Sequence, residues 1–184
     1  AEGIRGNEEM PDATHNVTLP FTRYIGGAAD YTICYYTNRI KTTHAHQLAM
    51  AAVYYSPIQT LFWYDKPSQS KDEPELEFWR KIPTTWDETK VVNGKIGEYV
   101  TIARRTGNDW FLGSMTNKTA RKLNLDFVFL AFGKKYKAHL YFDDATATTA
   151  TKVGLKTISV DHTSKLEVDL LASGGYAIWF EEEK

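Results

Sequence analysis

Three carboxylates, Glu2, Glu8 and Glu9, open this chain in a segment that contains two glycines and Arg5. Because glycine lets the backbone bend freely, the acids can be brought toward one point. Clustered carboxylates can bind a hard cation such as calcium, or they can work as an acid and its ionised partner at a glycosidic oxygen. Runs of charge are also typical of a solvated surface. The spacing alone therefore leaves a chemical site and an acidic surface terminus both open.

A second candidate for metal binding is the pair His44 and His46. The run Thr43–Tyr55 around them is rich in helix formers, begins with a capping threonine and precedes Pro57. Residues two apart on a helix point about 200° away from each other, so they cannot share one ion. We therefore expect two histidines on separate faces of a helix.

Other polar and aromatic residues favour structural roles. Trp110 and Trp179 stand in alternating segments, which predicts positions in a β core and not in a platform for stacking sugars. Arg23 and Asp30 have no nucleophile or base beside them in the sequence. They are expected to form a supporting ion pair or hydrogen bonds, and not to act in catalysis.

The elements that would position these residues fall into two halves, separated by the Pro-, Ser- and charge-rich stretch 66–74. In the first half we expect a buried strand or turn at Leu19–Ile25, then the helix at Thr43–Tyr55; a short helix at Pro74–Trp79 follows the boundary. The second half is expected to be all-β, with turns at spacings typical of sandwiches. The expected strands are Glu98–Arg105, Trp110–Thr116, Lys122–Leu130, Lys135–Phe142, Gly154–Val160, Lys165–Leu170 and Tyr176–Glu181.

Composition excludes several classes of protein. The chain has 184 residues, 42% hydrophobic and 24% charged, which indicates a globular protein with a substantial core. Its net charge of −1 argues against a nucleic-acid partner, which normally requires a basic patch. No apolar run approaches the roughly 20 residues of a membrane helix. The single cysteine, Cys34, excludes an intrachain disulfide and a zinc site made of cysteines.

Eight sequence blocks occur in one order along the chain. They are Glu2-x-x-Arg5-Gly6-x-Glu8, His15-Asn-Val-Thr-Leu-Pro-Phe-Thr-Arg23, Gly27-x-x-Asp30-Tyr31-Thr32, Thr43-His-Ala-His-Gln-Leu-Ala, Tyr55-Ser-Pro-Ile-Gln59, Pro83-Thr-Thr-Trp-Asp-Glu-Thr89, Gly97-Glu-Tyr-Val-Thr-Ile-Ala-Arg-Arg and Trp110-Phe-Leu-Gly-Ser-Met-Thr-Asn117. This series resembles the C-terminal portion of glycoside hydrolase family 97, which contains bacterial α-glucosidases and α-galactosidases. The similarity covers the chain up to Asn117 and, more loosely, the terminal strands.

The resemblance implies an α+β chain in three parts. Residues 1–68 would be the last units of a (β/α)8 barrel, residues 69–83 a linker with a short helix, and residues 84–184 a C-terminal antiparallel β-sandwich. The rest of the barrel would precede Ala1, so the chain is expected to be a fragment. Carried over by position, Glu8 resembles the general acid that protonates the leaving oxygen, and Glu2 one of several glutamates that hold calcium. The base or nucleophile would lie upstream, which leaves the stereochemical course open.

The same resemblance implies the function and surroundings of the intact enzyme. It would hydrolyse an α-linked oligosaccharide, either a glucoside or a galactoside, with calcium as cofactor, in the periplasm or at the surface of a bacterium. The fragment alone is expected to be inactive and to associate with itself through the incomplete barrel. A different class of function stays open, namely a non-catalytic carbohydrate-binding or structural β-sandwich module.

Overall fold

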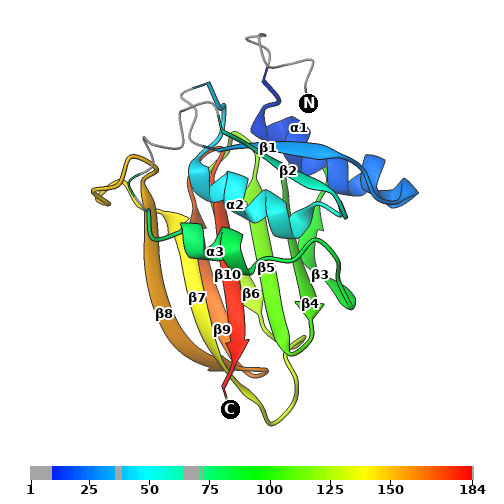
Figure 1. The fold of residues 1–184 in the computed structure, drawn as a ribbon, viewed down its shortest axis with the longest axis vertical. Coiled ribbons are helices and arrows are strands. Elements are labelled where there is room, and N and C mark those ends of the chain that lie inside the picture. Colours follow the sequence, from blue (N-terminus) through cyan, green and yellow to red (C-terminus); the bar gives the residue numbers. More distant parts are fainter. Residues whose placement is uncertain (1–9, 36–38, 64–70, 72, 184) are drawn as a thin grey trace.

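A six-stranded antiparallel sheet forms the centre of the molecule (Figure 1). The computed structural model describes residues 10–35, 39–63, 71 and 73–183. Helices α2 (His44–Val53) and α3 (Leu76–Lys81) cover one face of this sheet, and a two-stranded ribbon covers the other. A short parallel pair of strands accompanies the helices.

The large sheet has the strand order β3-β4-β5-β10-β7-β8, and every neighbouring pair is antiparallel. Its strands are β3 (Glu88–Lys95), β4 (Tyr99–Thr106), β5 (Asp109–Thr116), β7 (Lys135–Asp143), β8 (Val153–Asp161) and β10 (Gly175–Glu182). The ribbon pairs β6 (Arg121–Asp126) with β9 (Lys165–Leu170). A tight turn joins β4 to β5 at Gly107, whose φ of +56° is a conformation that suits glycine. The predicted antiparallel β-sandwich is confirmed.

Each face of the large sheet has its own apolar core, because successive side chains of a strand point to opposite faces. On the helix face, α2 is buried from Ala45 to Val53, and Phe78 of α3 is fully covered. The sheet contributes Val100, Phe111, Met115, Tyr141, Ala177 and Trp179 to this core. The core under the ribbon includes Trp110, Leu112, Leu125, Phe127, Leu140, Val168, Ile178 and Phe180.

The residues before the sandwich form a parallel βαβ unit. Helix α1 (Ala13–Thr18) leads through two 3-10 turns into β1 (Tyr31–Tyr35), and α2 then connects β1 to β2 (Gln59–Trp63). The two strands pair in parallel, with Tyr31 opposite Gln59. Within the described residues neither outer edge of this pair has a partner strand. Because parallel strands normally occur in larger sheets, the unit has the form of a repeat from a barrel or a doubly wound sheet.

Two glycines allow α2 to lie directly on the sheet. A Cβ atom at Gly113 of β5 would lie 2.2 Å from the carbonyl oxygen of Ala49, and one at Gly175 of β10 would lie 2.4 Å from the Cα of His46. Both distances are far below van der Waals contact, so only glycine fits at these positions. The helix backbone therefore touches the strand backbone, and α2 belongs to the same core as the sandwich.

The expected helices are present as α2 and α3, whereas the short helix α1 is not among the expected elements. Thr43 caps α2, since its hydroxyl accepts from the amide of His46 at 3.2 Å. The expected buried strand at Leu19–Ile25 is wrong: the segment forms two 3-10 turns without a buried residue, which corresponds to the alternative of a turn. Pro20 explains the difference, because it has no N–H to donate to a strand ladder.

All seven expected strands are present, six of them with shifted ends, and three further strands, β1, β2 and β3, are not among those expected. The strand expected at Lys122–Leu130 is wrong in its second half, since β6 ends at Asp126 and Phe127 enters the core from a turn. Of the three further strands, β3 lies at an edge of the large sheet, and its pairing with β4 shifts register between Val91 and Asn93. The side chains of β3 do not alternate between buried and exposed, so its sequence lacks the pattern from which a strand is predicted.

Candidate functional site

The predicted catalytic end of the barrel is the edge where the carboxyl ends of β1 and β2 meet, because barrel chemistry takes place on the loops there. The N-terminus of α2 lies at this edge, since α2 follows β1 in the chain. The N-terminus of α1 joins it through a parallel bridge between Asp12 and Lys41. Glu2 and Glu8 precede α1 but lie outside the described residues. The structure therefore shows what holds the elements that follow these two glutamates.

Asp12 fixes the start of α1. One carboxylate oxygen accepts from the amide of His15 at 2.9 Å, which caps the helix, and the other pairs with Nζ of Lys118 at 2.7 Å. Lys118 belongs to the turn between β5 and β6, so this ion pair ties α1 to the sandwich. The hydrogen bond from Lys118 is the main reason why the pKa of Asp12 is lowered. Met10, just ahead, is buried.

His46 lies fully buried between α1, α2 and the turn from β9 to β10. Its Nδ1 is 3.0 Å from the carbonyl oxygen of Gly174, and its Nε2 is 3.2 Å from the side-chain nitrogen of Asn16. Burial lowers its pKa to about 4, so the ring is neutral near pH 7. His44 instead packs edge-on against the ring of Tyr35, at 5.0 Å between centroids. The two histidines therefore have separate structural surroundings.

Asp143, at the end of β7, lies beside the same junction. Its carboxylate accepts from the amide of Gly175 at 3.2 Å and from Thr43, the cap of α2. Burial outweighs these hydrogen bonds and raises its pKa to about 6. A Cβ at Gly174 would lie 2.3 Å from an Asp143 oxygen, so this turn packs without a side chain. The N-terminus of α2 is thus seated on the turn between β9 and β10.

Arg104 of β4 holds the opposite end of α2. Its Nε donates to the carbonyl of Ala52 at 2.7 Å and one terminal nitrogen to that of Val53 at 2.9 Å. The other terminal nitrogen donates to the hydroxyl of Thr89 at 2.7 Å. A cation at a helix C-terminus is favourable because the last carbonyls carry partial negative charge. Both ends of α2 are therefore bound by residues of the sandwich.

Glu75 is a buried carboxylate between the two halves of the chain. Its Oε1 accepts from the hydroxyl of Tyr35 in β1 at 3.0 Å and from the hydroxyl of Thr151, in the loop between β7 and β8. Its Oε2 has no hydrogen-bond partner among the described residues. Burial raises the pKa of this carboxyl group. No feature of the local sequence indicates this role, since an acid near the start of a short helix is normally a surface residue.

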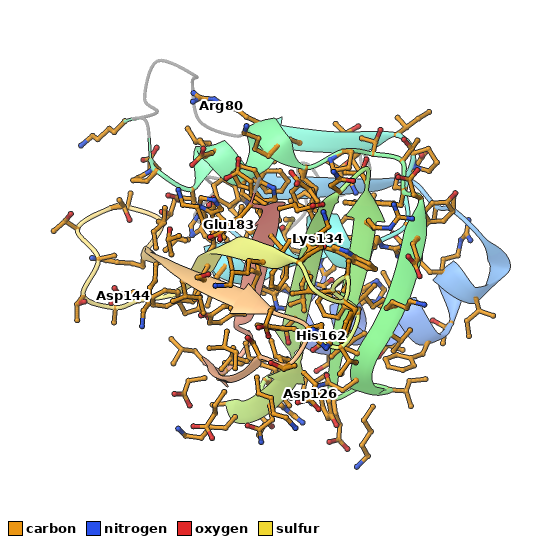
Figure 2. All side chains as sticks on the ribbon, turned by 90° about the horizontal axis from the view of Figure 1, so that it is seen from below. Arg80, Asp126, Lys134, Asp144, His162 and Glu183 are labelled. Atoms are coloured by element: carbon orange, nitrogen blue, oxygen red, sulfur yellow. The ribbon has the colours of Figure 1, made fainter. Side chains whose placement is uncertain are left out.

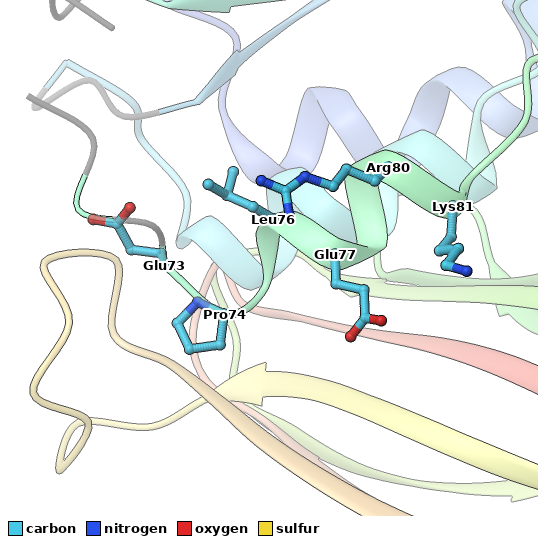
Figure 3. Close-up of a pocket in the computed structure, with 6 residues that line it drawn as sticks. All are labelled: Glu73, Pro74, Leu76, Glu77, Arg80 and Lys81. Atoms are coloured by element: carbon cyan, nitrogen blue, oxygen red, sulfur yellow. The ribbon is translucent and has the colours of Figure 1, made fainter. Parts of the chain in front are cut away.

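A polar pocket of about 620 Å³ opens beside α3. Figure 3 shows its six lining residues, Glu73, Pro74, Leu76, Glu77, Arg80 and Lys81. None of these residues is aromatic, and the charges are of both signs. The predicted core positions of Trp110 and Trp179 are confirmed, since both side chains are 3% exposed. The pocket and the two tryptophans therefore offer no aromatic surface on which a sugar could stack.

Arg23 and Asp30 do not form an ion pair. The guanidinium of Arg23 instead donates to the carbonyl of Ala28 at 3.2 Å, which stabilises the segment before β1. The expected supporting role of Arg23 thus holds through a hydrogen bond to the backbone. The expected ion pair is wrong, because the backbone carbonyl takes the place of the carboxylate as acceptor.

Among the described residues, no three His, Cys, Asp or Glu side chains lie close enough together to hold a metal ion. Figure 2 illustrates how dispersed the charges are, with Arg80, Asp126 and Asp144 on three different sides of the molecule. The described part of the chain by itself therefore does not fit a calcium ion, and the predicted ligand Glu2 lies outside it. In that same part, no helix is both long and apolar enough to cross a membrane.

Residues 85–181 match a protein family described as glycosyl-hydrolase 97 C-terminal, oligomerisation. A retaining α-galactosidase from Bacteroides thetaiotaomicron is 34% identical over 96% of this chain and 30% of its own length. A probable retaining α-galactosidase from Streptomyces bingchenggensis is 32% identical over 61% of this chain and 18% of its own length. The chain thus spans less than a third of these curated relatives.

Solved structures agree with the sequence relatives. A glycoside hydrolase family 97 enzyme from Pseudoalteromonas sp. strain K8, in complex with acarbose, superposes with a TM-score of 0.84 at 31% identity, over 94% of this chain and 29% of the enzyme. A β-arabinopyranosidase gives a TM-score of 0.79 at 30% identity, over 97% of this chain and 29% of the enzyme. Together with the family match over the sandwich, these similarities show that the chain belongs to glycoside hydrolase family 97 and carries the C-terminal part of such an enzyme.

Proposed function

We propose that this chain is the C-terminal part of an α-glycoside hydrolase that cleaves α-linked galactosides or glucosides. The observation that carries the proposal is the 34% identity to a retaining α-galactosidase over 96% of the chain. Within the part of the chain that the structure describes, the edges of the β1–β2 pair have no partner strand, which supports the proposal because upstream barrel strands would pair with them. In the intact enzyme, β1, α2 and β2 are then the last units of the barrel wall, and the sandwich packs against them.

Glu8 is the proposed general acid. It precedes α1 in the chain by only a few residues, and the described start of α1 is bridged to the loop that leads into α2, which supports this role. A carboxylic acid there donates its proton to the leaving glycosidic oxygen, and in a retaining reaction it then acts as the base that activates water. The second carboxylate comes from outside this chain, so the isolated chain does not turn over substrate.

Calcium binding by the intact enzyme is part of the same proposal, with Glu2 as the ligand from this chain. Carboxylate oxygens are the ligands that calcium prefers, and it requires six to eight oxygens, which one or two glutamates cannot supply. The remaining ligands must therefore lie upstream. Calorimetric titration of the complete enzyme with calcium tests this point: Glu2→Gln is expected to weaken binding, and unchanged binding would exclude Glu2 as a ligand.

A sugar-binding module is the less favoured function, because both candidate tryptophans are buried in the core. The sandwich instead braces the end of the barrel. Without the upstream strands the chain associates with itself, since Ile25 and Ile58 beside the open pair are 76% and 72% exposed. Light scattering at micromolar concentration is expected to give a dimer or larger species, and a clean monomer would contradict this. The enzyme is placed by this proposal in the bacterial periplasm or at the cell surface.

The function is tested by a graft. The matching C-terminal part of the Bacteroides thetaiotaomicron relative is replaced by this chain, and hydrolysis of nitrophenyl α-galactoside and α-glucoside is measured. We expect turnover by the grafted enzyme and none by the isolated chain. Glu8→Gln is expected to lower the rate about a hundredfold or more on a poor leaving group, because general acid catalysis supplies that much.

The neighbouring Glu9→Gln is the matched control and is expected to leave the rate within a few-fold. A leaving group that needs no protonation, such as dinitrophenolate, should rescue the step of Glu8→Gln in which the glycosidic bond breaks, since that step then needs no acid. In a retaining reaction the later attack of water still lacks its base, so the rescue is read from the first release of dinitrophenolate. Equal rates for Glu8→Gln and the unaltered graft on the poor leaving group would exclude Glu8 as the acid.

A further inference from the structure

The turns at one end of the sandwich hold the starts of both α1 and α2. In the turn between β9 and β10, the carbonyl oxygen of Ser173 accepts a hydrogen bond from the backbone amide of Thr43 at 3.1 Å. The turn between β5 and β6 provides Lys118 for Asp12. The two turns are joined to each other, because the amide of Ser173 donates to the carbonyl of Asn117 at 2.7 Å. Both helix starts therefore rest on one connected piece of the sandwich.

His46 is the only described side chain that bridges this piece to α1 through buried hydrogen bonds on both of its ring nitrogens. The carbonyl of Gly174 can only accept, so Nδ1 must carry the proton. Nε2 is then unprotonated and accepts from the amide nitrogen of Asn16. Protonation of the ring would break this arrangement, and burial keeps the ring neutral.

Asn16, a residue of α1, also forms hydrogen bonds with a residue of the β1–β2 pair and with Tyr54, which follows α2. Its side-chain oxygen accepts from the hydroxyl of Tyr31 in β1 at 3.3 Å, and its backbone carbonyl accepts from the hydroxyl of Tyr54 at 3.0 Å. Asn16 is 1% exposed, so a lost partner is not replaced by bulk water. Gly174, His46 and Asn16 thus form a buried chain of hydrogen bonds from the sandwich to α1.

From this geometry we infer that His46 is a positioning residue: it fixes α1, and with it the part of the chain that directly follows Glu8 in the sequence, relative to the sandwich. The inference rests on the proposed function for the role of Glu8. Asp12, at the start of α1, is four positions from Glu8 in the chain, which leaves little length over which a displacement of α1 could be absorbed. A displacement of about 1 Å at a reacting group can lower a rate by about a hundredfold.

Two substitutions at one position separate the two hydrogen bonds. The amide of Asn reaches about as far as Nδ1 of histidine, so His46→Asn keeps a donor for Gly174 and loses the acceptor for Asn16. The amide of Gln reaches about as far as Nε2, so His46→Gln keeps an acceptor for Asn16. Asn16→Ala removes the same contact from the side of α1. His139→Asn is the control, because His139 stacks on Trp179 at 4.5 Å between ring centroids and pairs with Glu181, both within the sandwich.

Hydrogen exchange of this chain is the first measurement. In His46→Asn and in Asn16→Ala, the amides of α1 are expected to exchange about tenfold faster relative to those of β4 and β5, because a buried hydrogen bond to α1 is lost. His46→Gln and His139→Asn should leave this ratio within about threefold of the unaltered chain. Exchange of α1 at the unaltered ratio in both His46→Asn and Asn16→Ala would overturn the inference, whatever the function of Glu8.

The grafted enzyme supplies the second measurement, the ratio of rates on a poor and an activated leaving group. Both rates come from one preparation, so the amount of folded enzyme cancels. His46→Asn is expected to change this ratio about tenfold in the direction of Glu8→Gln, with rescue in His46→Gln. If Glu8→Gln changes the ratio of the two rates but His46→Asn leaves it unchanged, the inference is overturned. If Glu8→Gln has no effect, the proposed role of Glu8 fails, and the exchange measurement alone decides the role of His46.

Discussion

One face of the large sheet receives a helix at backbone distance through Gly113 and Gly175, whereas the other receives the β6–β9 ribbon through interlocking aromatic and aliphatic side chains. Under the ribbon, the rings of Phe127 and Phe180 meet edge-on at 5.0 Å between centroids. Close approach of α2 to the sheet thus requires glycine at two strand positions, whereas packing of the ribbon requires large side chains such as Phe180. Since α2 precedes the sandwich in the chain and connects β1 to β2, the first core also joins the two halves of the protein.

The ribbon face should respond most strongly to truncation of a large side chain. Phe180→Ala is expected to lower the free energy of unfolding by about 4 kcal/mol, because it removes a buried ring and leaves a cavity. Urea unfolding measures the change. Phe132→Ala, at a side chain that is 85% exposed, is the matched control and should change stability little. Equal losses in the two variants would contradict the assignment of Phe180 to a close-packed core.

The helix face should respond to the opposite change. Gly113→Ala is expected to cost about 3 kcal/mol, since the new methyl group would push against the carbonyl of Ala49 and a methyl group of Val53. Gly26→Ala introduces the same methyl group where no atom lies within 4 Å, and it should be nearly neutral. Guanidinium unfolding of both variants gives the comparison. A neutral Gly113→Ala would show that α2 does not lie at backbone distance from β5.

The two neighbouring arginines of β4 distinguish the helix cap from a surface ion pair. Arg104→Met is expected to cost about 2 kcal/mol, because buried carbonyls at the end of α2 lose a charged donor. Arg105→Met should cost less than about 1 kcal/mol, since Arg105 pairs with Asp87 and Glu88 at the surface. Thermal unfolding measures both. A larger loss in Arg105→Met than in Arg104→Met would contradict the capping role.

The smallest expected effect concerns pH at the start of α2. Burial raises the pKa of Asp143 from 3.8 to about 6, so its contribution to stability falls as the pH rises through this interval. Burial lowers the pKa of His46 from 6.5 to about 4, so its contribution rises with pH over nearly the same interval. The two slopes oppose each other in the unaltered chain. Asp143→Asn should therefore make stability rise more steeply with pH, by about 1 kcal/mol per pH unit between pH 4 and 6.

Chemical unfolding at a series of pH values tests this balance. His46→Gln is the converse variant, and it should leave the slope of Asp143 uncompensated, so that stability decreases as the pH rises from 4 to 6. Identical pH profiles for the unaltered chain, Asp143→Asn and His46→Gln would show that neither pKa differs between the folded and the unfolded chain.

The parts of the fold that local sequence determines could be predicted. Thr43 and the helix formers after it located α2, and alternation with a polar turn located the β4–β5 hairpin. Contacts between residues distant in sequence could not be predicted. His46 and Gly174 are 128 positions apart, and Glu75 and Thr151 are 76 apart, so nothing in either local sequence indicates the partner. The edge strand β3 was missed because its exposed side chains follow no alternation.

The candidate site, too, could not be predicted from local sequence alone. Glu2 and Glu8 were assigned from resemblance to a family and not from their spacing, which also fits a solvated terminus. Both stay predictions, since they lie outside the described residues. The residues that the structure does bring together, His46, Asn16 and Asp143, have no motif of their own, because their roles depend on burial between elements that meet only in the folded chain.

The helix face of the sandwich has no complete core without α2 and α3, so the decisive measurement compares unfolding of residues 84–184, which lack both helices, with that of the full chain. Without these two helices, the side chains of Phe111, Met115 and Trp179 would lose their cover on the helix face. We expect residues 84–184 alone to bind a hydrophobic dye and to unfold without a cooperative transition, and residues 39–184 to regain that transition. A sharp transition of residues 84–184 at the midpoint of the full chain would contradict the account.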